Sequence, residues 1–394
     1  MKRRLTLATG CAIHALQDGL GATLYVLLPL LAQALGLSYA QIGIIRGAKS
    51  VAMLLFELPS GMLAERAGER LLLVFGLVCA GLAFLALQAG GSFEAIAMLL
   101  FLAGVGAGFQ HSLASTIITN SFAQGGRRAA LGAYNSAGDI GKLAFTGLFT
   151  LAIAMGFAWQ SVTTFYGALA LATALLAFIA LHHAGVGGRP AASPAQAPRP
   201  RPAGWGIRSR AGFAALAAIV FVDIAVQAGF LTFLAFLMAE KQVPTSLSVL
   251  AVVLTLAGGI VGKLGCGFLS EHLGVRRSLV LVQCLTAAGI VSILVLPSLV
   301  AFVLLPFLGL VLQGSSTITY GTVADLFDDA RHSRGFAAIY SISNAATVSG
   351  PVIFGIVSDA FGLQAAVIAM AVALLAPLPW SGLLSRSAPG ARTA

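Results

Sequence analysis

The chain has 394 residues, of which 58% are hydrophobic and only 9% charged, and its formal net charge is +10. Because a soluble domain carries about 25% charged residues, this composition excludes a water-soluble globule and predicts a polytopic membrane protein crossed by apolar runs of about twenty residues. The basic residues lie in short clusters between these runs rather than on one polar face, so we expect no nucleic-acid partner.

In chain order, the apolar runs predict an all-α protein with twelve transmembrane helices. Six spans fall near residues 5–34, 39–64, 70–89, 93–122, 128–153 and 159–182. Six more fall near residues 211–238, 245–270, 276–296, 299–324, 333–358 and 362–384. The start MKRR is similar to that of a secretory signal, but the apolar core of a signal is about 7–15 residues long and would not contain Asp18. We therefore expect the first run to be retained as a spanning helix.

A segment rich in Pro, Ala, Gly and Arg separates the two groups of spans, and such a composition cannot bury a core. The pattern therefore predicts an N-terminal six-helix bundle at residues 1–183, a linker at 184–210 and a C-terminal six-helix bundle at 211–394. Most Lys and Arg residues fall in the terminal segments, the linker and alternate loops. Since basic loops stay inside, we expect a multi-pass protein of the bacterial inner membrane with both termini in the cytoplasm.

A short motif recurs in the two halves. Gly61, Glu65, Gly68 and Arg70 are each followed 206 residues later by the same residue type, at Gly267, Glu271, Gly274 and Arg276. The first copy, GMLAERAGER, resembles the signature loop between helices 2 and 3 of the major facilitator superfamily, with Glu65 where that loop usually has Asp. The resemblance extends over the chain and implies the major facilitator fold, in which two pseudo-symmetric six-helix bundles enclose a cavity near mid-membrane.

Further motifs resemble the fosmidomycin-resistance-like branch of that superfamily. They are HALQD at 14–18, LPL at 28–30, GLSYAQIG at 36–43, FQHSLAS at 109–115, GGRR at 125–128 and NSAGDIG at 135–141. Helix 4 has Gln110 and His111 in the region where many proton-driven drug antiporters have an arginine. Helix 5 has Asp139 and Lys142 where neutral residues are expected, and the expected Gly-Pro step is absent there. The substrate can therefore differ from that of these relatives.

Charged residues lie inside the predicted spans. They are Asp18, Arg46, Lys49, Glu57, Asp139, Lys142, Asp223 and Lys263. Each unrelieved charge costs about 2.5–3.5 kcal/mol at a helix centre, so these side chains must pair with one another or face water. Helical spacing places His14 on the same face as Asp18, and Asp139 on the same face as Lys142.

We interpret Asp18, assisted by His14, as the principal proton-carrying carboxyl group. A carboxyl group held between burial and a nearby cation can exchange a proton near neutral pH, which is what coupling to a proton gradient requires. Asp223 is the expected counterpart in the other half, and Asp139 is a further candidate. The alternative for Asp139 is a local ion pair with Lys142, one turn away.

Three cations from neighbouring helices, Arg46, Lys49 and Lys142, favour a small anionic or zwitterionic substrate, for example a phosphonate. The alternative is that the intramembrane acids neutralise these cations. The polar residues that we expect to line the substrate cavity are His111, Gln17, Asn135, Gln227 and Gln313. For His111, a proton relay and a hydrogen-bonded packing role remain open.

A third group of residues is interpreted as gating. Glu57 and Lys263 occupy equivalent positions of the repeat and would bridge the halves. The resemblance implies that Glu65, Arg66, Arg70 and Glu271 form charge contacts that hold one access state. The alternative is that the basic residues of these loops serve topology alone.

These features together favour a proton-coupled efflux antiporter of a drug or metabolite, with proton-coupled uptake of a small organic anion as the alternative. A membrane-embedded enzyme is disfavoured because the chain has no zinc-protease, nucleophile-elbow or Walker motif. We expect no cofactor and no metal, since the four cysteines lie inside apolar runs without metal-ligand spacing. The expected partners are the small-molecule substrate, protons and the lipid bilayer, and the expected state is a monomer.

Overall fold

The computed structural model describes residues 2–122, 127–188, 206–327 and 332–385, without the side chains of some residues in these ranges. Within these ranges the chain is helical and forms no β-strand beyond one isolated bridge between Ile207 and Phe327. The chain divides into two compact units, Met1–Leu37 with Ile44–Pro198 and Ser38–Gly43 with Arg199–Ala394. The predicted all-α architecture is confirmed. The predicted linker at 184–210 falls largely on residues 189–205, outside the described residues.

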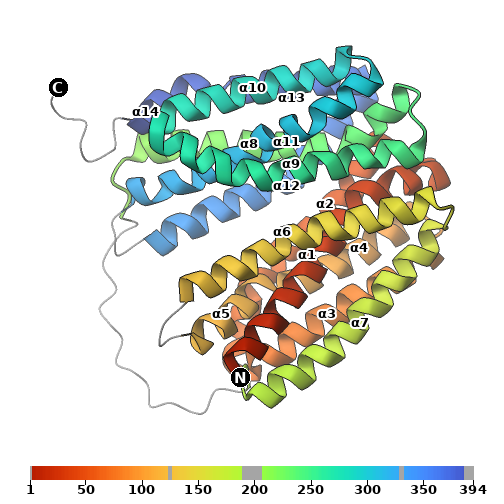
Figure 1. Ribbon diagram of the computed structural model, residues 1–394, viewed down its shortest axis with the longest axis vertical. Coiled ribbons are helices and arrows are strands. Elements are labelled where there is room, and N and C mark those ends of the chain that lie inside the picture. Colours follow the sequence, from red (N-terminus) through yellow and green to blue (C-terminus); the bar gives the residue numbers. More distant parts are fainter. Residues whose placement is uncertain (1, 123–126, 189–205, 328–331, 386–394) are drawn as a thin grey trace. The chain divides into compact units, whose positions relative to one another are not determined.

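The first unit is built from seven described α-helices and one short 3-10 helix (Figure 1). They are α1 (Lys2–Leu35), α2 (Tyr39–Ala67, of which the start belongs to the second unit), α3 (Glu69–Ala86), η1 (Leu87–Ala89), α4 (Phe93–Gly108), α5 (His111–Ser121), α6 (Arg127–Ala154) and α7 (Trp159–Ala184). Ser92 caps α4 by accepting a hydrogen bond from the Ala95 N–H, 3.2 Å long, which satisfies a donor that the helix leaves free. The α4 helix ends at Gly108 and α5 starts at His111, and together they form one candidate span, Phe93–Ser121.

Helix α1 is the centre of this unit because it packs along α6 and also against α7 and α5. Its apolar residues are almost fully buried, as at Ile13, Leu20, Leu24 and Leu27. A central helix buried on most of its surface can hold polar side chains only where neighbouring helices supply partners. The polar side chains of the turn at His14–Asp18 therefore need hydrogen-bond or ion-pair partners from other helices.

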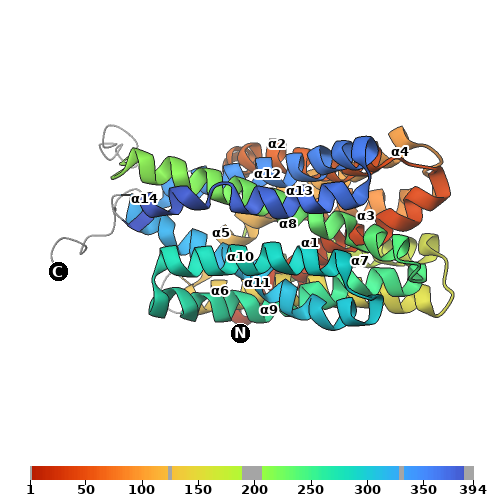
Figure 2. The same ribbon diagram turned by 90° about the horizontal axis from the view of Figure 1, so that it is seen from above.

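The second unit contains α8 (Arg210–Glu240), α9 (Thr245–Leu273), α10 (Val275–Val295), α11 (Ser298–Leu326), α12 (His332–Phe361), α13 (Leu363–Leu375), η3 (Leu378–Ser381) and α14 (Gly382–Ser385). Helix α9 packs most extensively on α11, and α8 on α12, while α10 lies against α11 and α13 (Figure 2). The α9 and α11 helices can come close together because Gly262 has no side chain. A Cβ atom at this position would collide with the main chain of Leu310. Small residues at helix crossings are the usual device for close packing in a membrane.

By length and composition, ten described helical segments are apolar enough to cross a membrane, and a bent α9 brings the number to eleven. The α2 helix is not among them, although it is 29 residues long. It is also the helix that carries Arg46, Lys49 and Glu57. The predicted second span at 39–64 is thus present as a helix, and its charged residues lower the mean hydropathy of its described part.

Candidate functional site

The site in the first unit begins with a close contact between α1 and α6. A side chain at Gly141 of α6 would collide with the main chain of Ala15, so the two backbones touch there. At Gly138, one turn earlier, a Cβ atom would lie 2.7 Å from His14 Nε2 and 3.0 Å from Asp18 Oδ2. The polar turn of α1 therefore lies directly against the glycine face of α6, within reach of its charged residues.

Asp18 is the centre of the cluster that results. Its Oδ2 lies 3.1 Å from Lys142 Nζ of α6 and 3.4 Å from His14 Nε2 of its own helix. Its Oδ1 lies 3.7 Å from His111 Nε2, at the start of α5. Lys142 Nζ is also 3.1 Å from Asp139 Oδ1, so one ammonium group joins both carboxylates. The two pairs predicted from helical spacing, His14 with Asp18 and Asp139 with Lys142, therefore belong to one network of contacts.

The tautomer of His14 follows from its second contact. His14 Nδ1 lies 2.8 Å from the main-chain oxygen of Tyr134, and its ring stacks on that of Tyr134 with centroids 4.1 Å apart. A carbonyl oxygen only accepts, so Nδ1 must carry a proton and donate it. Nε2 of a neutral His14 is then an acceptor that faces the acceptor oxygen of Asp18. The contact between them becomes favourable when a further proton resides on one of the two groups.

Two residues that the sequence analysis did not assign to the site hold this arrangement in place. The Tyr134 side chain is 2% exposed, and its hydroxyl accepts a hydrogen bond of 2.9 Å from Gln110 Nε2. Gln110 is also buried, at the break between α4 and α5. Together they fix the α6 turn whose carbonyl orients His14, and His111 lies edge-on to His14 with ring centroids 5.1 Å apart.

The cations of α2 have different surroundings. The guanidinium group of Arg46 lies 4.7 Å from the centre of the Tyr25 ring and donates to the Tyr25 hydroxyl at 2.9 Å and to Ser50 Oγ at 3.3 Å. Its Nε is buried and makes no hydrogen bond with the described residues. The ammonium group of Lys49 lies beside Gly21 of α1, where a Cβ atom would be 2.8 Å from Nζ. No ion pair or hydrogen bond of Lys49 occurs in the described part of the chain, although Asp18 is close enough to interact with it electrostatically.

Gln17 lies one turn from Gly21 on the same face of α1, 3% exposed, and its Nε2 has no acceptor among the described residues. The α1–α2 face thus presents three donor groups without acceptors, on Gln17, Arg46 and Lys49. Donors in excess of acceptors favour an anionic ligand, since a buried donor without a partner is costly. Asn135, the remaining candidate of this unit, is exposed on α6.

The polar candidates of the second unit serve interhelical hydrogen bonds. Asp223 is 2% exposed and accepts from Gln283 Nε2 at 2.8 Å and from Ser315 Oγ at 2.7 Å. Gln227 Nε2 donates to the carbonyl of Leu312 at 2.9 Å, and Gln313 Nε2 donates to that of Thr255 at 3.3 Å. Within the described residues no cation forms an ion pair with Asp223. Its surroundings are therefore neutral, in contrast to those of Asp18.

The three ligand atoms of His14, Asp18 and His111 lie within 4.8 Å of one another, close enough to hold a cation. Lys142 already places its ammonium group 3.1 Å from the same carboxylate. A divalent metal ion at this point would add two positive charges close to that ammonium group and be repelled by it. A proton adds only one positive charge, which the negative charge of Asp18 offsets. The chemistry of the cluster therefore fits proton exchange better than metal binding.

Comparison with known proteins decides the family. A model of the Major Facilitator Superfamily matches residues 9–265 and, in a second match, residues 216–393. The protein belongs to the major facilitator superfamily. It is therefore a multi-pass membrane transporter rather than an enzyme, and it carries out secondary transport by alternating access.

Solved structures of superfamily transporters share this fold. A bacterial homolog of the human lysosomal transporter Spinster, in an inward-facing and unoccupied conformation, is similar with a TM-score of 0.82 and 16% identity, and the match covers 100% of this chain and 99% of that one. The nucleoside transporter NupG is similar with a TM-score of 0.76 and 13% identity, over 97% of this chain and 99% of that one. At such identities the likeness shows the fold alone. No curated protein matches the sequence.

The residues predicted to act in gating lie near the ends of their helices or further along them. Arg70 donates its main-chain N–H to the Gly187 carbonyl at 2.8 Å, and its guanidinium group lies 5.6 Å from the centre of the Phe178 ring. Arg66 and Glu271 are exposed at the ends of α2 and α9. Glu57 and Lys263 are partly buried in different units, so their bridge remains a prediction, and the side chain of Glu65 lies outside the described residues.

Proposed function

We propose that this superfamily member is a proton-coupled efflux transporter of a small zwitterionic compound with an anionic group, such as a phosphonate. The observation that carries the proposal is the position of Asp18, which meets His14, His111 and Lys142 in one contact network. A carboxylate that faces an imidazole acceptor has a place for one added proton, which the two groups can share in a hydrogen bond. The predicted relation to the fosmidomycin-resistance-like branch agrees with this reading.

The proton site and the anion site are adjacent but separate. Asp18, His14 and Lys142 form the proton site, with Asp139 as the second partner of Lys142. The free donors of Gln17, Arg46 and Lys49 form the anion site. Because Lys142 is already shared by two carboxylates, Lys49 is the better anchor for an anionic group.

The charge of the substrate sets the direction of coupling. A zwitterion with its anionic group on Lys49 would place its cationic group against Asp18, where it competes with the proton. Competition means that substrate binding releases a proton, and this is the condition for antiport and therefore for efflux into an acidic exterior. A zwitterion is thus the substrate type that best fits efflux.

A pure anion would behave in the opposite way. Protonation of Asp18 removes a negative charge near Lys49 and Lys142, so it strengthens anion binding. Proton and anion would then bind together, which is the condition for symport. The excess of donors on the α1–α2 face is the specific observation that favours this second candidate, proton-coupled uptake of a small organic anion.

One experiment separates the two candidates. Aminomethylphosphonate, a zwitterion, and methylphosphonate, an anion of similar size, would each be added to purified protein in weakly buffered solution with a pH-indicator dye, and each would be tested for flux in proteoliposomes under an imposed pH gradient. Proton release with gradient-driven exchange of the zwitterion supports efflux by antiport. Proton uptake with co-transport of the anion supports the symporter. A flux that does not respond to the pH gradient with either compound would reject proton coupling.

A further inference from the structure

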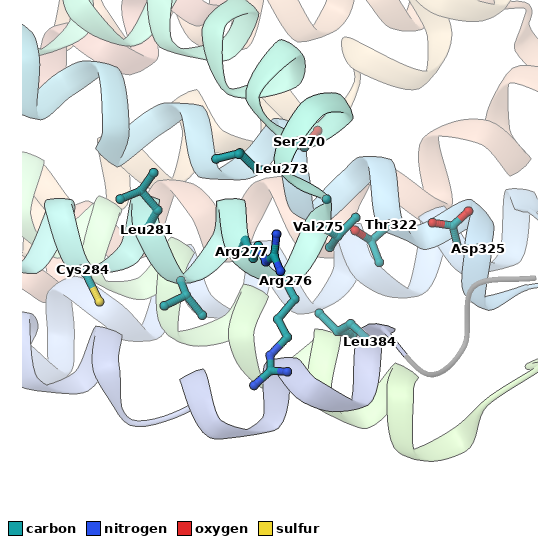
Figure 3. A pocket seen from close by; sticks show the side chains of 12 residues that line it. Ser270, Leu273, Val275, Arg276, Arg277, Leu281, Cys284, Thr322, Asp325 and Leu384 are labelled. Atoms are coloured by element: carbon teal, nitrogen blue, oxygen red, sulfur yellow. The ribbon is translucent and has the colours of Figure 1, made fainter. Parts of the chain in front are cut away.

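A cavity of about 910 Å³ lies in the second unit, far along the chain from the polar cluster of α1. It is lined by the start of α10, the end of α9, and parts of α11 and α14 (Figure 3). The charged residues in its lining are Arg276, Arg277 and Asp325, so the cavity carries an excess of positive charge. Neither arginine forms an ion pair with a described residue.

The start of α10 adds to this positive charge. Its N-cap, Gly274, supplies no side-chain hydrogen bond, and the first turn contains no acidic residue. The main-chain N–H groups of Val275, Arg276 and Arg277 have no partner in the described part of the chain, since the first turn of a helix cannot bond to itself. A helix start with free N–H groups attracts an anion, and two arginines beside it strengthen the attraction.

The equivalent turn of the first unit is built differently, which makes it an internal comparison. Gly68, which lies 206 residues before Gly274, also begins a helix with a positive φ angle. There the Arg70 N–H donates to the Gly187 carbonyl at 2.8 Å, and Glu69 supplies an acidic side chain in the first turn. The chain itself thus supplies that turn with one carbonyl acceptor and one acidic side chain. The turn at Gly274 lacks both devices among the described residues.

The rest of the lining is apolar and follows one face of α10. Val280, Leu281 and Cys284 continue the 3–4 spacing that begins at Arg277, and Leu273 of α9 and Leu384 of α14 complete the wall. Figure 3 shows the arginines at the start of the helix and Leu281 and Cys284 further along it. Because α10 is apolar enough to span the membrane from Val275 onward, the arginines lie at its water boundary and the apolar wall lies within the hydrocarbon.

We infer that this cavity binds one anionic phospholipid, with the phosphate at Arg276, Arg277 and the start of α10, and an acyl chain along Leu281 and Cys284. A free phosphate would satisfy the arginines but not the apolar wall, and a neutral hydrophobic molecule would leave the arginines unpaired. An amphiphile with a negative head group satisfies both. Basic pockets between helices at a membrane surface are suited to such head groups.

The test uses the full-length protein in nanodiscs of phosphatidylcholine with and without phosphatidylglycerol. Thermal unfolding of the protein and retention of lipid in native mass spectrometry are measured for each composition. We expect phosphatidylglycerol to raise the melting temperature of the wild type and one such lipid to be retained. The double variant Arg276→Gln/Arg277→Gln should lose about one order of magnitude in affinity for that lipid and most of the thermal shift.

Two further variants and one control ligand test whether the effect depends on this cavity. Lys2→Gln/Arg4→Gln removes the same charge from exposed positions at the start of α1 and should keep the effect. Leu281→Trp fills the apolar wall, leaves both arginines, and should weaken the lipid effect. Inorganic phosphate in pure phosphatidylcholine should not replace the lipid. Retention of the full effect in the arginine double variant, its equal loss in the Lys2/Arg4 control, or full replacement by phosphate would overturn the inference.

Discussion

The ammonium group of Lys142 on α6 lies 3.1 Å from a carboxylate oxygen of Asp18 on α1. These residues are 124 positions apart in the sequence and meet because Gly138 and Gly141 allow the two helices to touch. Lys142 also binds Asp139, so protonation of Asp18 would release one of two carboxylates from the same cation. Asp18 can thus change its charge without leaving the ammonium group unpaired.

The first prediction concerns Asp18→Asn. The amide keeps the size of the side chain but removes the exchangeable proton, so flux driven by a pH gradient should fall by at least an order of magnitude. Exchange of labelled for unlabelled substrate, without a gradient, should persist because it needs no change of protonation. Both rates are measured in the same proteoliposomes. Asp223→Asn, whose carboxylate has neutral partners, is the matched control and should keep gradient-driven flux; a reversal of the two results would contradict the assignment.

The second prediction concerns the pH profile. Imidazole changes its charge between about pH 5 and 8, and a glutamine amide does not. His14→Gln can still donate to the Tyr134 carbonyl, so the protein should fold, but the pH dependence of substrate exchange over this range should become flatter. In the wild type, acidification of the exterior should increase efflux, because it favours the protonated pair at that face. His183→Gln, exposed at the end of α7, should leave the profile unchanged. An unaltered profile in His14→Gln would remove His14 from the proton site.

The helical spacing of the sequence gives the contacts within each helix. The pairs His14–Asp18 and Asp139–Lys142 lie four and three residues apart, and the structure has both as close contacts. These contacts were predictable because residues three or four apart share a helix face. The contacts between helices were not, since periodicity says which face is polar but not which helix covers it. The small residues at positions 138 and 141 were the available signal for a close crossing.

The internal repeat had a similar limit. The expected counterpart of Asp18 in the other half is Asp223, which the offset of 206 residues pairs with Gln17 rather than with Asp18. The repeat relates the backbones of the two halves but not their side chains. Gln283 and Ser315, which donate hydrogen bonds to Asp223, lie 206 residues after the apolar residues Leu77 and Phe109. Tyr134 and Tyr340, another matched pair, differ in the same way, because Tyr134 is 2% exposed and Tyr340 is 53% exposed. A duplicated fold therefore does not imply a duplicated site.

The third prediction separates the cations. Lys49 has no described ion pair, so Lys49→Gln should leave the melting temperature nearly unchanged while it weakens binding of methylphosphonate by about tenfold or more. Lys142→Gln removes the shared partner of two carboxylates, and breaking such a partly buried ion pair should destabilise the protein by up to about 3–5 kcal/mol. Thermal unfolding and isothermal titration of both variants check this contrast. Unchanged anion binding in Lys49→Gln, with folding intact, would move the anion site elsewhere.

The fourth prediction concerns the α1–α6 crossing. In Gly141→Ala the added methyl group meets the Ala15 main chain, which cannot move away without displacing α1. Overpacking of this kind costs about 1–3 kcal/mol, and it should also separate Asp18 from Lys142. We therefore expect a lower melting temperature together with reduced gradient-driven flux.

The matched control for this crossing is Gly321→Ala, because Gly321 lies inside α11 with open space around it. Alanine there should be neutral or slightly stabilising, since it lowers the conformational entropy of the unfolded chain without a steric conflict. Both variants are compared in thermal unfolding and in proteoliposome flux. If Gly141→Ala matched Gly321→Ala in both measurements, the contact between α1 and α6 would not be what brings Asp18 to Lys142, and the proton site would need another support.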